Sequence, residues 1–391
     1  MKKILAVTGI RSEYDIAYPI LDRLRKSGAF DVRIVVSGAH LSELHNYSAA
    51  RVEADGFEIA DRIDSLLMTN RTVQRSKGVG LLIAGLTQTV EREKPDFLFV
   101  VGDREESIAT TVVGNYMNVL TAHLGGGDPA YGNADDPIRF ACSKLAHIHF
   151  AISENYAENL CRLGEESFRI CFCGNPANAN IVGTPVLALD EISSRISFDV
   201  TDGNYLVVLK HPLSSEHEDT YHQMRAALEA IVDFSRSHKL KVIGIRPNSD
   251  PGSYDILRAI DEIQASDAVR FFHTLPRKVF VNLVRNALCL VGNSSMGILE
   301  APMYRLPVVN IGNRQKGRLN AGNVVFTTYQ KDEIKRALKQ ACFDLPYREM
   351  VRNLQNPYGD EYAPDRVVDF LQGVDISNKA WYLKKKLCIE E

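Results

Sequence analysis

The stretch that decides the fold lies at residues 288–318 and reads LCLVGNSSMGILEAPMYRLPVVNIGNRQKGR. An apolar run of four residues stops at Gly-Asn-Ser-Ser, and a helical segment follows. A second apolar run then leads into a loop with Arg314, Lys316 and Arg318. A strand, a helix and another strand in this order are typical of a parallel sheet that is covered by helices. The stretch therefore predicts one unit of an α/β architecture.

The same alternation runs along the rest of the chain in two sets, which predicts an α/β protein with two Rossmann-like doubly wound domains. The segment 174–194 is rich in Gly, Pro and Asn and is the expected domain boundary. We expect domains at 1–180 and 181–364, a ligand cleft between them, and a C-terminal helix and tail at 365–391 that packs back on the first domain. The predicted strands are 3–7, 32–36, 97–101, 119–123, 148–152 and 170–173 in the first set, and 205–209, 241–245, 269–272, 287–291 and 308–311 in the second.

The bulk properties are those of an ordinary soluble globular protein, with 45% hydrophobic and 24% charged residues among 391. The formal net charge of −3 argues against a general nucleic-acid binder. No apolar run is long enough to cross a membrane. The apolar N-terminal segment is followed at once by Arg11 and Glu13, so it indicates a first strand and not a signal peptide. Seven cysteines without zinc-site spacing are expected to be reduced thiols of a cytoplasmic protein.

Charged residues and glycines follow the predicted strands of the first domain, where ligands bind in open α/β sheets. Arg11 and Arg104 are cations suited to an anionic ligand. Asp103 is either the N-cap of the next helix or an acid–base group. Asp135 stands four residues before Arg139, so these two residues form either an ion pair on a helix surface or part of a site. We expect acid–base chemistry in the segment that three glycines open to a ligand: Gly125, Gly126, Gly127, Asp128, Asp135, Asp136 and Arg139.

The second domain carries groups suited to a nucleoside diphosphate. His211 follows a strand directly, and Ser294 and Ser295 stand where a helix begins, so their hydroxyls either cap that helix or bind a diphosphate together with Arg314. Glu300 has the chemistry to accept hydrogen bonds from ribose hydroxyls. Two further residues are candidates for contact with a base, one in a turn and one on a helix: Asn248 and Phe280.

The motifs GNSSMGILEAPMYRLPVVNIGNRQKGR, GDR, DDPIR with SKLAHIH, and HP occur in this order along the chain. Together they resemble the hydrolysing UDP-N-acetylglucosamine 2-epimerases from about residue 3 to about residue 370. The resemblance implies a glycosyltransferase-B-like architecture, a UDP-sugar substrate and a UDP product, with no nicotinamide or metal cofactor. It also implies a homodimer or homotetramer. The implied reaction removes the C2 proton, expels UDP to leave a 2-acetamidoglycal, and adds water to give free N-acetylmannosamine for sialic acid synthesis.

The resemblance also implies roles for individual positions. Those that match nucleotide-phosphate contacts are Arg11, Arg104, His211, Ser294, Ser295 and Arg314. Glu300 matches the ribose contact, and Phe280 and Asn248 fall near the uridine. The catalytic candidates are Asp103, Asp128, Asp135, Arg139 and His211, and the sugar-side candidates are His40, Gly126, Gly127 and Asp136.

One position departs from the family pattern. Many relatives carry Glu, regarded as an acid–base group, where this chain has Gly125. That role passes to Asp128, Asp103 or Asp135, or the substrate is another sugar. The first alternative is the similar epimerase of legionaminic acid synthesis, which acts on a UDP-linked 2,4-diacetamido-2,4,6-trideoxy sugar. Further alternatives are a non-hydrolysing epimerase, a glycosyltransferase of the same architecture, and a non-catalytic nucleotide-sugar binding protein. The GDR and DDPIR motifs favour the hydrolysing branch.

Overall fold

A computed structural model describes residues 1–43, 47–67, 73–129, 135–213, 219–247, 252–263 and 267–386, with the side chain of Asp135 left out. The described chain divides into two compact units. Unit 1 comprises residues 1–129, 135–180 and 358–386, and unit 2 comprises residues 181–357. Within these residues, no helix is both long and apolar enough to cross a bilayer.

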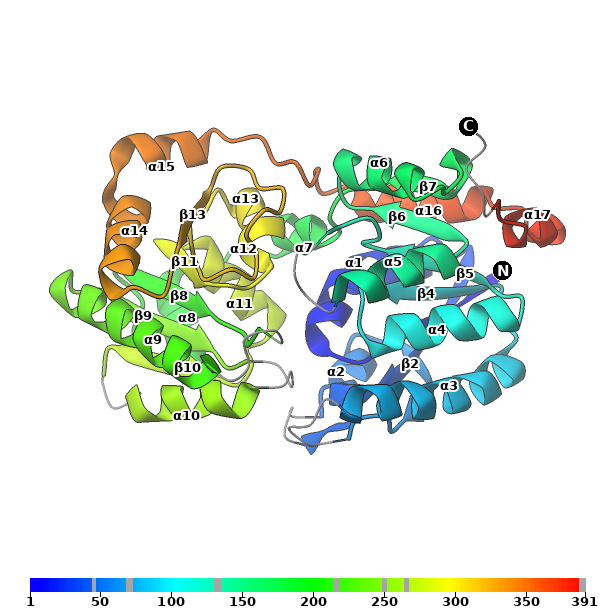
Figure 1. Ribbon diagram of the computed structural model, residues 1–391, viewed down its shortest axis with the longest axis horizontal. Helices are drawn as coiled ribbons and strands as arrows, with labels where there is room; N and C mark the ends of the chain where they lie inside the picture. Colours follow the sequence, from blue (N-terminus) through cyan, green and yellow to red (C-terminus); the bar gives the residue numbers. More distant parts are fainter. Residues whose placement is uncertain are drawn as a thin grey trace. The chain divides into compact units, whose positions relative to one another are not determined.

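Unit 1 is built on a parallel sheet with the strand order β3-β2-β1-β4-β5-β6-β7 (Figure 1). The order reverses between β1 and β4, as in a doubly wound fold. Its strands are β1 (Lys2–Thr8), β2 (Phe30–Ser37), β3 (Glu58–Ile63), β4 (Phe97–Val101), β5 (Leu120–Leu124), β6 (Ile148–Ala151) and β7 (Ile170–Phe172). Its helices are α1 (Arg11–Lys26), η1 (Gly38–Leu41), α2 (Ala49–Ala54), α3 (Val73–Glu93), α4 (Glu105–Tyr116), α5 (Asp135–Leu145), α6 (Glu154–Arg162) and η3 (Ser167–Arg169), with α7 (Ala177–Gly183) running into unit 2.

The last part of the described chain belongs to unit 1. It contains α16 (Ala363–Gly373), η5 (Ile376–Asn378) and α17 (Lys379–Leu383). The Lys2 ammonium donates to the carbonyl oxygens of Leu371 at 3.0 Å and Val374 at 2.5 Å, at the end of α16. The rings of Phe150 in β6 and Phe370 in α16 also meet edge to face, with centroids 5.6 Å apart. The helix α16 therefore contacts both the first strand and β6.

Unit 2 repeats the plan with the parallel strand order β10-β9-β8-β11-β12-β13, and its order reverses between β8 and β11. The strands are β8 (Tyr205–Leu209), β9 (Lys241–Ile245), β10 (Val269–Phe272), β11 (Cys289–Gly292), β12 (Val308–Ile311) and β13 (Val324–Thr327). The helices are α8 (Leu189–Ile196), α9 (Thr220–Ser237), α10 (Ser253–Ile263), α11 (Arg277–Arg285), α12 (Met296–Leu299), α13 (Ala301–Tyr304), α14 (Lys331–Phe343) and α15 (Leu345–Arg352).

Burial on both faces explains why the central strands read as unbroken apolar runs. In β8, Leu206 and Val208 belong to one buried cluster, whereas Tyr205 and Val207 belong to another. Because side chains alternate between the two faces of a strand, each face of this sheet has a hydrophobic core of its own.

The predicted α/β architecture of two doubly wound parallel sheets is confirmed. Two strands were not predicted, and both lie at a sheet edge. In β3 only Ile63 is buried, and in β13 no residue is. An edge strand has one open side and needs no continuous apolar run, so periodicity did not indicate it. The helix expected after Ser295 is also shorter than its sequence pattern predicted, because it is divided into the two single turns α12 and α13.

Candidate active site

The candidate site residues of both units lie at or beside the points where the strand order reverses. In unit 1 these points are the ends of β1 and β4, and in unit 2 the ends of β8 and β11. Loops that leave neighbouring strands in opposite directions open a crevice at such a point, and ligands of open α/β sheets bind there.

Arg139 is the centre of the polar cluster in unit 1. This residue lies in α5, and its guanidinium forms an ion pair with Asp103, the second residue after β4. It also contacts Asp128, the fourth residue after β5, at 3.0 Å to the carboxylate and 2.5 Å to the backbone carbonyl. The structure thus brings together three of the predicted catalytic residues.

The electrostatics of this cluster keep the guanidinium charged. The side chains of Arg139, Asp103 and Asp128 are only 11%, 16% and 5% exposed. Burial lowers the pKa of Arg139, but the neighbouring charges of Asp103 and Asp128 outweigh it, so the pKa is raised above its usual value. The charge of the guanidinium offsets part of the cost of burying the two carboxylates. The cluster therefore places two carboxylates and one cation together at the ends of β4 and β5.

Asp103 stands directly before Arg104, the N-cap of α4, and its carboxylate pairs with Arg139. The alternative of a helix-surface pair between Asp135 and Arg139 involves a side chain outside the described residues. The partners that the structure gives Arg139 come from the ends of two strands, which a surface pair within one helix would not produce.

A buried histidine contacts residues next to this cluster, and it was not predicted from the sequence. His123, the fourth residue of β5, is fully buried, and its Nε2 lies 2.7 Å from the carbonyl oxygen of Gly102. Its Nδ1 lies 3.3 Å from the Ser143 hydroxyl, which donates to the carbonyl oxygen of Arg139 at 3.1 Å. Burial lowers the pKa of His123 to about 4, so the imidazole is neutral. The sequence signal was a histidine inside an apolar strand.

The remaining unit 1 candidates surround the ends of β1 and β2. Arg11 is the first residue of α1 and is partly buried, and the side chain of Arg104 is 21% exposed. Burial raises the pKa of Glu13 well above its usual value, and Arg104 opposes that shift. His40 is fully buried, with Nε2 at 3.1 Å from the Thr8 hydroxyl and Nδ1 at 2.8 Å from the Ser48 hydroxyl. Both of its ring nitrogens are thus engaged with hydroxyl groups.

The three glycines after β5 differ in the space around them. Gly125 and Gly127 have φ values of +84° and +75°, which favour glycine. A Cβ on Gly127 would overlap the carbonyl oxygen of Tyr156, and one on Gly126 would lie 2.7 Å from the Ser143 hydroxyl. A Cβ on Gly125 would meet nothing within 4 Å. The space around Gly125 is therefore open. Asp136, in the first turn of α5, is partly buried and adds negative charge near Arg139.

Asn293 organises the strand ends of unit 2. It follows β11 and exchanges two hydrogen bonds with the backbone of His211 after β8, at 2.7 Å and 2.9 Å. Its own carbonyl oxygen accepts from the Arg314 guanidinium at 3.0 Å and from the Gln315 amide at 3.1 Å. Two of the predicted phosphate contacts, His211 and Arg314, are thereby joined to one residue.

Ser294, Ser295 and Glu300 follow β11 along the chain, and Phe280 lies in α11, the helix before that strand. The Ser294 hydroxyl accepts from the backbone N–H of Met296 at 3.3 Å, so this hydroxyl stabilises the short turn α12. Ser295 is the N-cap of α12 without a side-chain hydrogen bond to it, and Glu300 lies between α12 and α13. Phe280 is partly buried and packs against the apolar core. Asn248 lies outside the described residues.

Sequence reasoning missed two residues of unit 2. Asn293 is 2% exposed and makes the contacts given above. Lys210 is 4% exposed, directly precedes His211, and has its ammonium 5.3 Å from the centre of the Tyr329 ring. A lysine at the end of an apolar strand was the available signal, because a buried lysine requires a specific environment.

Two doubly wound units with polar residues at their switch points define a class of α/β proteins with the glycosyltransferase-B-like fold. Residues 22–372 match the family model described as UDP-N-acetylglucosamine 2-epimerase. The chain is 30% identical over 379 residues to the hydrolysing UDP-N,N'-diacetylbacillosamine 2-epimerase of Legionella pneumophila, which covers 97% of this chain and 98% of that protein. The chain therefore belongs to the UDP-N-acetylglucosamine 2-epimerase family, and the predicted family resemblance is confirmed.

The chain is also similar to two proteins from Neisseria meningitidis. The chain is 28% identical over 344 residues to the UDP-N-acetylglucosamine 2-epimerase of Neisseria meningitidis serogroup B, with 88% of each chain covered. A crystal structure of a UDP-GlcNAc 2-epimerase from Neisseria meningitidis, bound to UDP-GlcNAc, superposes with a TM-score of 0.80 at 19% identity, over 95% of this chain and 99% of that one. At that identity the superposition shows the shared fold.

Proposed function

We propose that this protein is a hydrolysing UDP-N-acetylglucosamine 2-epimerase, which converts UDP-N-acetylglucosamine and water to N-acetylmannosamine and UDP. The observation that carries the proposal is the ion-paired cluster of Arg139 with Asp103 and Asp128 at the carboxyl ends of β4 and β5. Membership of the epimerase family supports the UDP-sugar as substrate. Relatives whose names specify hydrolysis support the release of free sugar.

The first step is an elimination. A carboxylate takes the proton from C2 of the sugar, the electron pair forms the C1–C2 double bond, and the C1–oxygen bond to UDP breaks. The products are the 2-acetamidoglycal, UDP and a protonated carboxyl group. Asp103 is our candidate for the base because its side chain is more exposed than that of Asp128, 16% against 5%. Arg139 pairs with this carboxylate and orients it.

The second step is a hydration. Water adds its oxygen to C1 and gives up one proton to a carboxylate, while a carboxyl group delivers a proton to C2 from the opposite face, which inverts that carbon and gives the free sugar. Asp128 and Asp135 are the candidates for the proton donor. The C2 proton is only weakly acidic, so stabilisation of the departing diphosphate must lower much of the barrier.

Unit 2 is the proposed binding site for UDP. His211, Asn293 and Arg314 are already joined by hydrogen bonds, so a diphosphate there would meet preorganised donors and a cation. We assign Ser294 and Ser295 to the same diphosphate and Glu300 to the ribose. Phe280 and Asn248 are proposed near the uridine, and Arg11 and Arg104 are proposed as phosphate contacts.

A UDP-linked 2,4-diacetamido-2,4,6-trideoxy sugar is the second candidate substrate. The relative from Legionella pneumophila, named for UDP-N,N'-diacetylbacillosamine, favours it at 30% identity over nearly the whole chain. The open space at Gly125, where many relatives carry Glu, is a second observation in its favour, because a substituent at C4 requires room.

The deciding experiment offers the two UDP-sugars separately in heavy water and identifies the products by NMR. We expect free UDP and a free 2-epimerised sugar that carries deuterium at C2. A UDP-linked epimer without free UDP would establish a non-hydrolysing enzyme, and a product without deuterium would exclude deprotonation at C2. Turnover only after an acceptor is added would indicate a glycosyltransferase. Binding of UDP with no turnover of either sugar would indicate a binding protein.

A matched pair of variants separates chemistry from binding. Asp103→Asn should lower kcat by about a hundredfold or more, the usual contribution of an acid–base group. Asp96→Asn, which changes a carboxylate next to β4 at the other end of the strand, should leave kcat unchanged. We further propose a homodimer or homotetramer in the cytoplasm, on the basis of the family resemblance, and light scattering would measure the assembly.

A further inference from the structure

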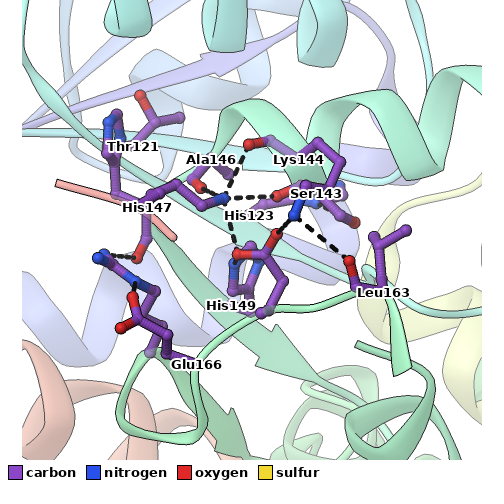
Figure 2. Close-up of polar contacts among 12 residues, drawn as sticks. Thr121, His123, Ser143, Lys144, Ala146, His147, His149, Leu163 and Glu166 are labelled. Atoms are coloured by element: carbon purple, nitrogen blue, oxygen red, sulfur yellow. Dashed lines mark hydrogen bonds and ion pairs between the residues drawn. The ribbon is translucent and has the colours of Figure 1, made fainter. Parts of the chain in front are cut away.

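A second polar cluster in unit 1 lies at the opposite end of α5 from its first turn, and the proposed reaction does not use it (Figure 2). Lys385, in the segment after α17, points its ammonium at three backbone carbonyl oxygens at the end of α5. The distances are 3.2 Å to Ser143, 2.8 Å to Lys144 and 2.6 Å to Ala146. The last carbonyls of a helix have no partner within the helix, and a cation there also complements the helix dipole. Lys385 therefore caps α5.

A buried carboxylate holds this ammonium in place. Glu165 is fully buried at its side chain and pairs with Lys385 at 2.7 Å, with Lys144 at 2.8 Å and with His149 Nε2 at 2.9 Å. Burial alone would raise the pKa of Glu165, but the hydrogen bond from His149 and the two ammonium groups outweigh it and lower the pKa to about 2. Burial lowers the pKa of Lys385 to about 8, against the opposing effect of Glu165. At neutral pH both groups are charged.

The segment that carries Lys385 is fixed from the other direction by Arg169. This fully buried guanidinium donates to the backbone carbonyls of the tail, at 3.4 Å to Trp381, at 2.9 Å to Lys384, and also to Tyr382. It is itself held by the carboxylate of Glu166 at 2.8 Å. Two buried cations thus join the tail to the body of unit 1, one from each side.

A chain of contacts connects this cap to the ion-paired cluster. Ser143, whose carbonyl oxygen accepts from Lys385, donates its hydroxyl to the carbonyl oxygen of Arg139 one turn earlier. The same hydroxyl lies 3.3 Å from His123, which reaches the carbonyl oxygen of Gly102, next to Asp103. The last turn of α5 therefore helps to orient both members of the Arg139–Asp103 pair. Arg139 lies four residues before Ser143 in the same helix, which is about 6 Å along its axis.

We propose that Lys385 is a positioning residue for the Arg139–Asp103 pair, which it orients by capping the C-terminal end of α5. Its effect on turnover rests on the proposed function, whereas its effect on α5 does not. Without the cap, Ser143 O and Lys144 O lose a charged donor, and Glu165 loses one of its two ammonium partners. The last turn of α5 then opens more often, and Ser143 is held less firmly.

The test compares Lys385→Met with Lys386→Met in the full chain. Lys386 is the matched control, because it is the same residue type one position further on and is exposed. The first measurement is hydrogen–deuterium exchange of the peptide that covers α5, without ligand. Loss of a hydrogen bond to a charged group should raise exchange there by about tenfold or more in Lys385→Met and not in Lys386→Met. Unchanged exchange in folded Lys385→Met would overturn the proposal.

The second measurement separates positioning from general destabilisation. We expect kcat to fall by about tenfold in Lys385→Met, while the Kd for UDP stays within about twofold, because unit 2 supplies the proposed UDP site. Equal losses in kcat and UDP affinity would contradict positioning. If the wild type turns over neither sugar, the proposed function fails while the exchange result still decides the role of Lys385. If Lys385→Met does not fold, Lys385→Gln replaces it, since a shorter neutral amide cannot cap three carbonyls, and the same exchange criterion applies.

Discussion

Substitution of Gly292 by alanine tests how the loop after β11 is held. Gly292 ends that strand with a φ of +140°, where side chains are rarely tolerated. An alanine Cβ would overlap the carbonyl oxygen of Leu209 and lie 2.5 Å from its carbonyl carbon. That oxygen accepts the backbone N–H groups of Asn293 at 3.0 Å and Ser294 at 3.3 Å. The clash therefore displaces the acceptor that anchors the proposed diphosphate loop.

The strained backbone and the two hydrogen bonds set the loss in the free energy of unfolding. Backbone strain of this kind costs about 1–3 kcal/mol, and each of the two weakened hydrogen bonds contributes about 1 kcal/mol. We expect Gly292→Ala to lower the free energy of unfolding of unit 2 by about 3–5 kcal/mol. With a urea m value of about 2–3 kcal/mol/M for a unit of this size, the midpoint should fall by about 1.5 M.

Two probes and one control make the assay specific. Far-UV circular dichroism follows both units, whereas Trp381, the sole tryptophan of the chain, lies in unit 1. The dichroism transition should shift to lower urea more than the fluorescence transition does. Gly80→Ala is the control, because Gly80 is an exposed position inside α3 with no atom within 4 Å of an added Cβ. It should raise stability by up to about 1 kcal/mol. A midpoint for Gly292→Ala within about 0.4 M of the wild type would refute the reasoning.

Three further predictions use other contacts. Arg139→Met leaves two carboxylates without their cation in a largely buried cluster, so urea unfolding should show a loss of about 3–5 kcal/mol; a second change, Asp103→Asn, should restore part of it, and no restoration would argue against the ion pair. Asn293→Asp keeps the acceptor for the His211 N–H but places a negative charge against the His211 carbonyl oxygen. Calorimetry should therefore show UDP binding weakened by about tenfold or more. Wild-type affinity for UDP would contradict the proposed binding site. Burial, together with the charges of Lys385 and Arg169, lowers the pKa of His147 to about 3 from 6.5, so its stabilising effect is complete above pH 6.5 and lost as the pH falls toward 3. The difference in unfolding free energy between wild type and His147→Asn should therefore shrink by about 2 kcal/mol from pH 7 to pH 5, and a constant difference would exclude a buried neutral histidine.

The sequence was sufficient for the fold because burial on both faces leaves a direct signal. Strands such as β8 must be apolar at every position, and this makes them visible without any structural information. The edge strands β3 and β13 carry polar or partly exposed side chains, and their existence depends on pairing with β2 and β12. Pairing is a property of the folded chain, so a local pattern does not reveal it.

The candidate site likewise contains residues that the sequence indicated and residues that it did not. Asp103 and Asp128 could be selected because both follow strands, and Arg139 because it stands beside carboxylates in the sequence. Their mutual pairing depends on how α5 lies against the ends of β4 and β5. Asn293 was missed because an asparagine after a glycine is ordinary in any turn. Only its two bonds to His211 show that it joins two strand ends.

Lys385 is a residue that its position relative to the strands does not indicate. The rule selects residues that follow strands, and Lys385 lies 213 positions beyond Phe172, the last residue of β7, in a mostly polar tail. A lysine among three consecutive lysines, 384–386, reads as a solvated charge in any sequence pattern. It is buried because Glu165 is buried, and Glu165 is ionised because His149 and two lysines contact it. Each of these groups would be costly to bury alone. Since the tail brings a necessary partner for that carboxylate, the contact links the end of the described chain to the helix that carries Arg139.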